Sequence, residues 1–195
     1  MKNYLLFLLF LSVNIFGQQS FILKNNGSRI DVDPTSVRVV TTEKILVYKE
    51  YQKNAEKTIS FNDFDYAFYS GFKFKILNLK GSEKDGYFIL SECKDKFMVS
   101  KVVTTGDQDS DNQELSYQLS VIDDKLNILE TFSFNEEKNS KNIALRDLIL
   151  PTATKHFPNC DDLLNRFNDY NKRNNDVKNL TILGVFRAPV YLACK

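Results

Sequence analysis

The alternation of apolar and polar residues predicts mainly β-strands over the first two thirds of the chain. Residues 71–79, GFKFKILNL, alternate Phe72, Phe74 and Ile76 with two lysines, and a period of two buries one face of a strand and leaves the other in water. Similar short apolar runs recur as far as residue 134, and turn-forming residues separate them. Because no helical period comes between these runs, we expect an antiparallel meander and not a parallel sheet.

The first of these runs form a predicted hairpin. The pair Asn26-Gly27 lies between two apolar runs and favours a type I′ turn, and Asp33-Pro34 predicts a bend after the second run. The further predicted strands are residues 37–41, 45–51, 58–61, 71–79, 87–92, 97–105, 114–122 and 128–134.

Helical spacing replaces the period of two after residue 142. Residues 143–150 have the apolar spacing of a helix, which Pro151 is expected to end or kink. Asn159 is predicted to cap a second helix, whose apolar stripe consists of Leu163, Leu164, Phe167 and Tyr170. Residues 180–186 and 189–193 are expected to form one or two final strands.

These elements predict an α+β fold that is mainly β. We expect an antiparallel meander or a partly closed sheet, with one or two C-terminal helices packed on it. Residues 19–195 are expected to form a single domain, with its helical part at about 143–173 and a strand at the end.

Residues 1–18, MKNYLLFLLFLSVNIFGQ, have the pattern of a signal peptide. A single cation, Lys2, precedes an apolar run that is too short to span a membrane. Cleavage after Gly17 or Gln18 would fit the preference for small residues at this position, and no cysteine follows to carry a lipid. We therefore expect an exported protein, periplasmic or at the cell surface, with no membrane span in the mature chain. The alternative is a buried N-terminal helix.

The charge of the mature chain is balanced. The sequence has 26 basic and 25 acidic residues, and loss of Lys2 makes the two numbers equal. Proteins that bind nucleic acid through phosphates carry a basic excess, and so do those that dock on anionic lipid. The composition therefore argues against both partners.

The three cysteines allow one disulfide bond. The cysteines are Cys93, Cys160 and Cys194. A bond between Cys160 and Cys194 would join the second helix to the final strand, and in the chain-entropy model the loop that it closes stabilises the fold by about 3–4 kcal/mol. The alternative is that all three are reduced and buried as small apolar residues. The chain has no C-x-x-C motif, which disfavours a zinc or thiol-exchange motif.

The opening hairpin, the short aromatic-rich strands and the ending HFPNCDDLLNRFNDYN resemble exported β-rich proteins of unknown function common in Bacteroidota. In those proteins a strand, an Asn-Gly turn and a second strand follow the signal. A late helix carries a D-C-x-x-L type segment followed by Tyr-Asn. This chain has the segment at residues 159–163, with Asn159 where the pattern often has Asp, and the pair at 170–171. The resemblance implies an envelope location and supplies no functional residues.

The stretch 105–115, TGDQDSDNQEL, begins like a calcium loop. Its possible ligands are Asp107, Asp109, Asp111 and Glu114. An EF-hand also needs glycine at position 6 and glutamate at position 12, but Asn112 and Gln118 stand there. We expect a solvated hairpin tip, and a looser calcium site made by the four carboxylates is the alternative.

Catalytic constellations are not evident. The single histidine, His156, is four residues from Cys160, but Pro158 breaks the helix that would place the two on one face. The carboxylate pairs are Asp123-Asp124, Glu136-Glu137 and Asp161-Asp162. They lie at predicted turns and at a helix start, where capping and solvation account for them.

Residues 61–74, FNDFDYAFYSGFKF, contain seven aromatic residues, more than one strand face can bury. Exposed aromatic residues mark partner or ligand sites. The candidate binding residues are Phe64, Tyr66, Phe68, Tyr69 and Tyr87. Packing in the core is the competing interpretation, and the absence of Trp favours it.

Three functions follow from these patterns. The leading hypothesis is a non-enzymatic exported envelope protein that binds another protein through its sheet or through residues 61–74. The alternative is a small-ligand or glycan-binding protein, with Tyr66, Tyr69 and Tyr87 in its site. A hydrolase with paired carboxylates is the third. No cofactor is expected.

Overall fold

The computed structural model describes residues 19–105, 114–137, 139–171, 184–187 and 189–194. The fold is mainly antiparallel β with a smaller helical part, as the sequence predicted. The strands are β1 (Phe21–Lys24), β2 (Arg29–Asp31), β3 (Arg38–Val40), β4 (Ile45–Lys49), β5 (Glu56–Ser60), β6 (Phe64–Tyr69), β7 (Phe72–Leu77), β8 (Asp85–Cys93), β9 (Lys96–Thr105), β10 (Glu114–Asp123), β11 (Ile128–Asn135) and β12 (Leu192–Ala193). The helices are α2 (Ser140–Asp147), α3 (Ile149–His156) and α4 (Asp161–Asn171), and residues 184–187 are also helical.

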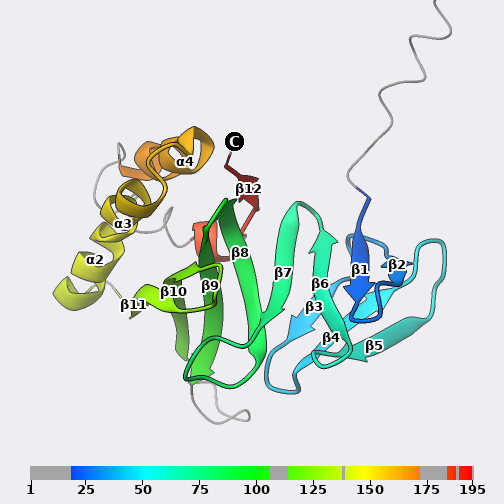
Figure 1. Ribbon diagram of the computed structural model, residues 1–195. Helices are drawn as coiled ribbons and strands as arrows, with labels where there is room; N and C mark the ends of the chain where they lie inside the picture. The colour runs from blue at the N-terminus through cyan, green and yellow to red at the C-terminus, as the bar shows by residue number, and fades with distance from the viewer. Residues whose placement is uncertain (1–18, 106–113, 138, 172–183, 188, 195) are drawn as a thin grey trace, which may run out of the picture.

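The strands form two sheets that do not close into a barrel. The large sheet has the order β11-β10-β9-β8-β7-β6-β1-β2, and β12 pairs with β8 outside this path. From β6 to β11 it is the expected meander. The small sheet, β3-β4-β5, leaves this path and forms a second antiparallel sheet, a division that the strand pattern alone did not indicate. Figure 1 shows β3–β5 at one end of the molecule and the helices at the other.

The small sheet packs on the large one because its apolar residues need a second face to cover them. Leu46 and Ile59 of the small sheet share a buried cluster with Ile22, Ala67 and Phe74 of the large sheet. Ile22 pairs with Ala67, and Ala67 pairs with Phe74, so these three lie side by side on one face. The side chains next to them in sequence therefore point to the opposite face.

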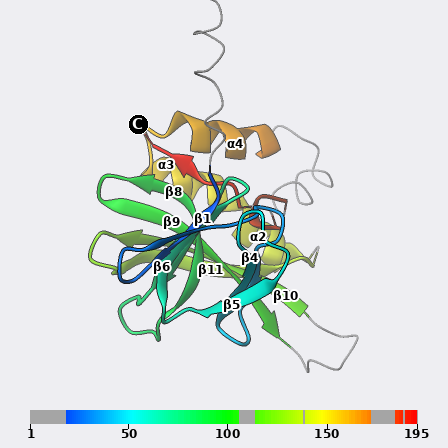
Figure 2. The ribbon, with the colours of Figure 1, turned by 90° about the vertical axis from the view of Figure 1, so that its right-hand side faces the viewer.

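The helices cover β8–β11 at the other end of the large sheet. The shared core contains Met98, Tyr117 and Leu119 from the strands, and Phe157 and Phe167 from the helical part. Figure 1 places α2, α3 and α4 away from β3–β5, and in Figure 2, which views the molecule from the side of β4 and β5, α2 lies behind the strands. The predicted stripe of α4 is present in Leu163 and Phe167, which are buried.

Two local predictions in the C-terminal part need correction. The predicted break by Pro151 is present, since the helix over 143–150 is interrupted at Leu148 between α2 and α3, and Pro151 itself lies in the first turn of α3, where a residue without an N–H loses no intrahelical bond. Cys160 and not Asn159 precedes α4, and its carbonyl accepts the first helical bond, from Leu164 N at 3.0 Å. The described part of the predicted strand 180–186 begins at Gly184 and is helical. Val185 and Phe186 are consecutive and both buried, whereas consecutive side chains of a strand point to opposite faces.

Candidate functional site

The structure divides the five predicted binding residues between the core and the surface. Phe64, Tyr69 and Tyr87 are buried, whereas Tyr66 and Phe68 are half-buried. Tyr69 follows the inward side of β6, and a register shift between Leu23 and Lys24 brings Phe64 inward as well. Burial raises the pKa of Tyr69, and it also raises the pKa of Tyr87. Three of the five residues are therefore core residues and offer no rings to a partner.

Tyr66 and Phe68 belong to a row of rings on the side of β1, β6 and β7 that faces away from Ile22, Ala67 and Phe74. Further along the same side, Tyr87 and Ile89 lie in a buried cluster against which Tyr191 packs. Phe21 on β1 pairs with Phe68 on β6, and Phe68 pairs with Lys73 on β7. The Phe21 ring lies 5.7 Å from that of Tyr66 and 6.3 Å from that of Phe68, measured between centroids. Tyr191, near the C-terminus, continues the row at 6.4 Å from Phe68. We call this surface the aromatic face: Phe21, Tyr66, Phe68, Lys73 and Tyr191.

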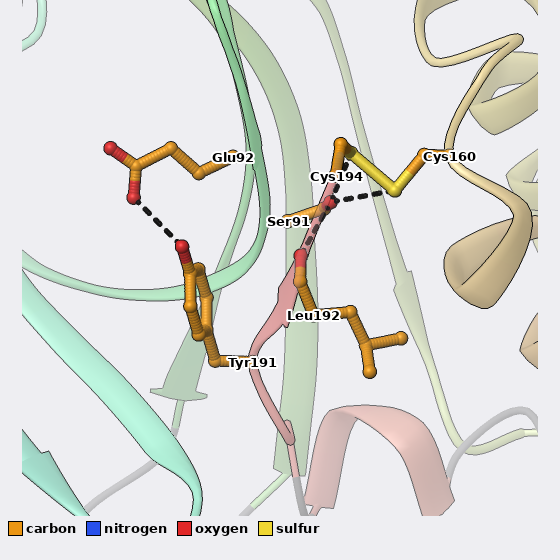
Figure 3. The surroundings of a disulfide bond; sticks show 6 residues. All are labelled: Ser91, Glu92, Cys160, Tyr191, Leu192 and Cys194. Carbon is orange, nitrogen blue, oxygen red and sulfur yellow. Dashed lines mark hydrogen bonds between the residues drawn. A yellow bond between two sulfur atoms is a disulfide. The ribbon is translucent and has the colours of Figure 1, made fainter.

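Lys73 lies among the rings of the aromatic face. Its Nζ is 4.8 Å from the centroid of the Tyr191 ring and 5.6 Å from that of Tyr66, distances at which a cation is attracted to a π-system. The same Nζ forms an ion pair with Glu92. Tyr191 Oη donates a hydrogen bond to Glu92 Oε2 at 3.2 Å, as Figure 3 shows. These contacts fix the direction of both side chains before any partner arrives.

Burial and the neighbouring Glu92 carboxylate raise the pKa of Tyr191 to about 12. The phenol therefore stays protonated at neutral pH and remains a hydrogen-bond donor. With Lys73 neutralised by Glu92, the aromatic face presents rings and one internally paired cation, and no net charge.

The rim of the aromatic face is also internally paired. The Arg29 guanidinium lies over the Phe21 ring at 4.1 Å from its centroid and pairs with Asp31 at 2.7 Å. Lys75 lies 3.8 Å from Asp65 on the neighbouring strand. A partner would thus meet apolar area edged by balanced charge, the usual composition of a protein interface.

A separate hollow of about 650 Å³ lies beside the β1–β2 turn. Its lining is mostly polar and comes from Lys24, Asn25, Asn26, Ile45, Tyr48, Thr58, Ile59, Ser60, Asn62 and Asp63. The Asn25 side chain donates to Asn62 O at 2.5 Å, and this bond holds the hairpin turn against the β5–β6 turn. None of the three tyrosines predicted for a ligand site, Tyr66, Tyr69 and Tyr87, is among the residues that line this hollow.

The three cysteines meet where α4, β8 and the C-terminal segment come together. Cys160 and Cys194 form a disulfide bond, which Figure 3 shows beside Ser91 of β8. The Sγ atoms of Cys93, Cys160 and Cys194 all lie within 4.8 Å of one another. Three thiolates could hold a soft metal ion, but the disulfide occupies two of the three ligand atoms.

His156 has a structural partner. Its Nε2 lies 2.9 Å from Glu130 Oε2, and the same carboxylate accepts hydrogen bonds from Lys155 Nζ at 2.8 Å and Thr152 Oγ1 at 3.1 Å. These bonds join α3 to β11. Because Cys160 is in a disulfide, it does not form a nucleophilic pair with this histidine.

Among the predicted carboxylate pairs, Asp123 has turn partners, Glu136 has partners distant in the sequence, and Asp161 and Asp162 lie in the first turn of α4. Asp123 accepts from the backbone N–H groups of Lys125 and Asn127 at 2.9 and 2.8 Å. Glu136 accepts from Arg187 and from the Tyr117 hydroxyl, at 2.6 Å each.

The acidic loop remains a prediction. Asp107, Asp109 and Asp111 lie outside the described residues, and Glu114 is described only as the first residue of β10.

Three members of the aromatic face, Phe21, Lys73 and Tyr191, were not predicted from the sequence. Phe21 and Lys73 carry a usable signal, since each is next in sequence to a residue that is buried, Ile22 and Phe74. Tyr191 gives no such signal because it comes from the far end of the chain and reaches Gly71 O through a backbone bond of 2.9 Å.

Fold and site together define a mainly antiparallel β protein with a helical layer and an aromatic outer face. The chain matches no protein-family model, and comparisons with curated proteins and with solved structures find no match. None of the helices in the described part of the chain has the length and apolar character that a membrane span requires.

Proposed function

We propose that this chain is a non-enzymatic, exported envelope protein that binds another protein through the aromatic face. The observation that carries the proposal is the row of half-buried rings, Tyr66, Phe21, Phe68 and Tyr191, on the side of β1 and β6 opposite the cluster of Ile22, Ala67 and Phe74. Aromatic residues and cations with buried stems dominate the binding energy of protein interfaces. The face combines both.

The shape of the aromatic face favours a protein over a small molecule as the partner. Small ligands bind in concave sites that bury most of their surface. The hollow beside the β1–β2 turn is lined by other residues. A sheet face with rings projecting from paired strands offers the broad contact of a protein interface.

The electrostatics of the aromatic face predict how binding responds to salt. Lys73, Arg29 and Lys75 each pair with a carboxylate of this chain. Little attraction is left for a charged partner, so burial of apolar area supplies most of the affinity. Binding should therefore persist at high ionic strength, unlike a steered electrostatic contact.

The envelope location in this proposal rests on residues 1–18 and on the resemblance to exported proteins of Bacteroidota. N-terminal sequencing of protein recovered from the envelope fraction tests it. A mature chain that starts at Gln18 or Gln19 supports export, and an intact Met1 in the cytoplasmic fraction contradicts it.

Site-specific photo-cross-linking in the native envelope tests the binding face. A photoreactive phenylalanine analogue replaces Tyr66 or Phe68, and Tyr51, which is 61% exposed, serves as the matched control. We expect one stoichiometric adduct from positions 66 and 68, identified by mass spectrometry, and none from position 51. Equal adducts from all three positions, or none from 66 and 68, would contradict the proposal.

The hollow beside the β1–β2 turn supports a second candidate function, the binding of a small polar ligand such as a sugar. Its volume of about 650 Å³ lies in the range of small-molecule sites, and its Asn, Asp, Ser and Thr side chains suit hydroxyl groups. Nuclear magnetic resonance titration with a panel of oligosaccharides tests it. Shifts confined to residues 24–26 and 58–63 would favour this function, and shifts at Tyr66 and Phe68 would move the ligand to the aromatic face.

A further inference from the structure

Cys93 lies next to the disulfide bond through the pairing of β8 with β12. Leu192 pairs with Ser91 and Ala193 with Glu92, in parallel register. The next residue on each strand is a cysteine, and Cys194 N donates to Glu92 O at 3.3 Å. The register thus brings Cys93 beside Cys194. Accordingly, the Sγ atoms of the three cysteines all lie within 4.8 Å of one another.

Ser91 adds a polar group to the same place. Its Oγ lies 2.9 Å from Cys194 Sγ, 3.4 Å from Cys160 Sγ and 2.8 Å from Leu192 O. A disulfide sulfur has no proton to donate, and the Ser91 hydroxyl has a single proton, so in the present state Ser91 donates to one of these three atoms at a time. If Cys160 became a thiol, Ser91 Oγ could accept its proton.

We propose that Cys93, Cys160 and Cys194 form an internal thiol–disulfide exchange site. The Cys93 thiolate attacks Cys194 Sγ, the Cys93–Cys194 bond forms, and the Cys160–Cys194 bond breaks. Cys160 leaves as a thiolate and takes up a proton, which balances the one that Cys93 lost. The number of disulfides is unchanged, so the step needs no external oxidant or reductant.

Exchange would change which elements the disulfide joins. In the structure the bond connects the start of α4 with the C-terminal strand, as Figure 3 shows. In the exchanged state the C-terminal strand is bonded to β8 and α4 is released from it. Only side-chain sulfur atoms need to move, because the strand pairing that brings Cys93 beside Cys194 is already present.

Solvent reaches this site. Cys93 is half-buried, and a hollow of about 160 Å³ is lined by Cys160 and Cys194 together with Asn159, Asp161, Asp162 and Ala193. Protons can therefore enter and leave during the exchange.

The protonation of Cys93 sets the speed of exchange. Burial raises the pKa of this thiol, and the Asp95 carboxylate raises it further, whereas Lys96 opposes them. Tyr191 is a further ionisable group near Cys93. Glu92, paired with Lys73, precedes Cys93 in β8, and Asp161 and Asp162 line the hollow beside the disulfide. Only the thiolate attacks a disulfide, so exchange is slow at neutral pH and speeds up as the pH rises.

Peptide mapping of the wild-type protein tests the proposal. The oxidised protein is incubated at about pH 7 and about pH 9, quenched with acid at intervals, alkylated with N-ethylmaleimide and digested without reduction. We expect label on Cys160 as well as on Cys93, together with a Cys93–Cys194 peptide. The rate should rise about tenfold per pH unit below the thiol pKa. Label that stays on Cys93 alone at every time and pH would overturn the proposal.

Two variants sharpen the test. In Cys160→Ser, a glutathione redox buffer should form a Cys93–Cys194 bond, and two free thiols in a protein with wild-type circular dichroism would count against the proposal. Cys93→Ser is the matched control and should retain Cys160–Cys194 with no labelled thiol. If Cys160→Ser does not fold, the wild-type time course decides.

Discussion

Gly86 on β8 lies beneath the ring of Phe74 on β7. A Cβ atom at Gly86 would come within 2.1 Å of Phe74 Cζ and 2.9 Å of Phe61 Cε2. Both rings are buried and lie 5.4 Å apart between centroids. The core therefore cannot admit a methyl group without moving one of them. Glycine is required here by the close approach of the rings and not by its backbone angles.

We accordingly predict that Gly86→Ala lowers the free energy of unfolding by about 1–3 kcal/mol, the usual cost of overpacking. Urea denaturation followed by circular dichroism measures it. Gly184→Ala is the control, because a Cβ there meets nothing within 4 Å, and it should change stability by less than about 0.5 kcal/mol. Equal effects of the two substitutions would show that steric contact with Phe74 is not the cause.

The division of the aromatic segment into inner and outer rings gives the second prediction. Phe64 is fully buried and Phe68 is half-buried. We expect Phe64→Ala to cost about 3–5 kcal/mol, the range for a buried phenylalanine. Phe68→Ala should cost roughly 1 kcal/mol and leave the fold intact. The midpoints of urea unfolding separate the two, and a cost for Phe68→Ala as large as that for Phe64→Ala would place Phe68 in the core.

The sequence predicted the parts of this fold that depend on local patterns. The alternation in 71–79 identifies β7, and it also indicates that Lys73 faces away from Phe74. The stripe of Leu163 and Phe167 identifies α4. In both cases neighbouring residues carry the whole signal.

The parts that were wrong or missed depend on distant contacts. Strands β3–β5 resemble the others in pattern, and they leave the meander because Leu46 and Ile59 cover Ile22 and Phe74, which no local period shows. Phe64 was predicted to belong to a binding site, but it lies in the core. Its inward position depends on the register shift between β1 and β6, which the sequence of β6 does not show. Tyr191 joins the aromatic face through a contact between the C-terminal segment and Phe68 on β6, residues far apart in the sequence.

Glu130 gives the third prediction, which concerns acid stability. Hydrogen bonds from Lys155 and then from His156 lower the pKa of Glu130 to about 2, below the ordinary 4.5 of the unfolded chain. A depressed pKa in the folded state stabilises the fold at pH values above the unfolded pKa. We therefore expect this stabilisation to be present at neutral pH and lost as the pH falls from about 4.5 to about 2.

Glu130→Gln tests this expectation through thermal unfolding as a function of pH. At neutral pH the free energy of unfolding of the variant should be lower than that of the wild type by on the order of 0.5–1 kcal/mol. Between pH 5 and pH 2 the stability of the variant should fall less than that of the wild type. Glu43, exposed in the turn between β3 and β4, supplies the control Glu43→Gln, which should keep the wild-type pH dependence. A Glu130→Gln profile parallel to that of the wild type would remove Glu130 as the source of acid sensitivity.

The fourth prediction is the stability that the disulfide contributes. Cys160 and Cys194 are separated by 34 residues, and closing a loop of this length in the unfolded chain is worth about 3–4 kcal/mol. Cys194→Ser should show this loss in a Cys93→Ser background, where no other disulfide can form. Cys93→Ser alone should unfold at nearly the wild-type urea concentration under non-reducing conditions. If the double variant is as stable as Cys93→Ser, the bond does not constrain the unfolded chain, and the packing of α4 on the sheet holds the C-terminal segment without it.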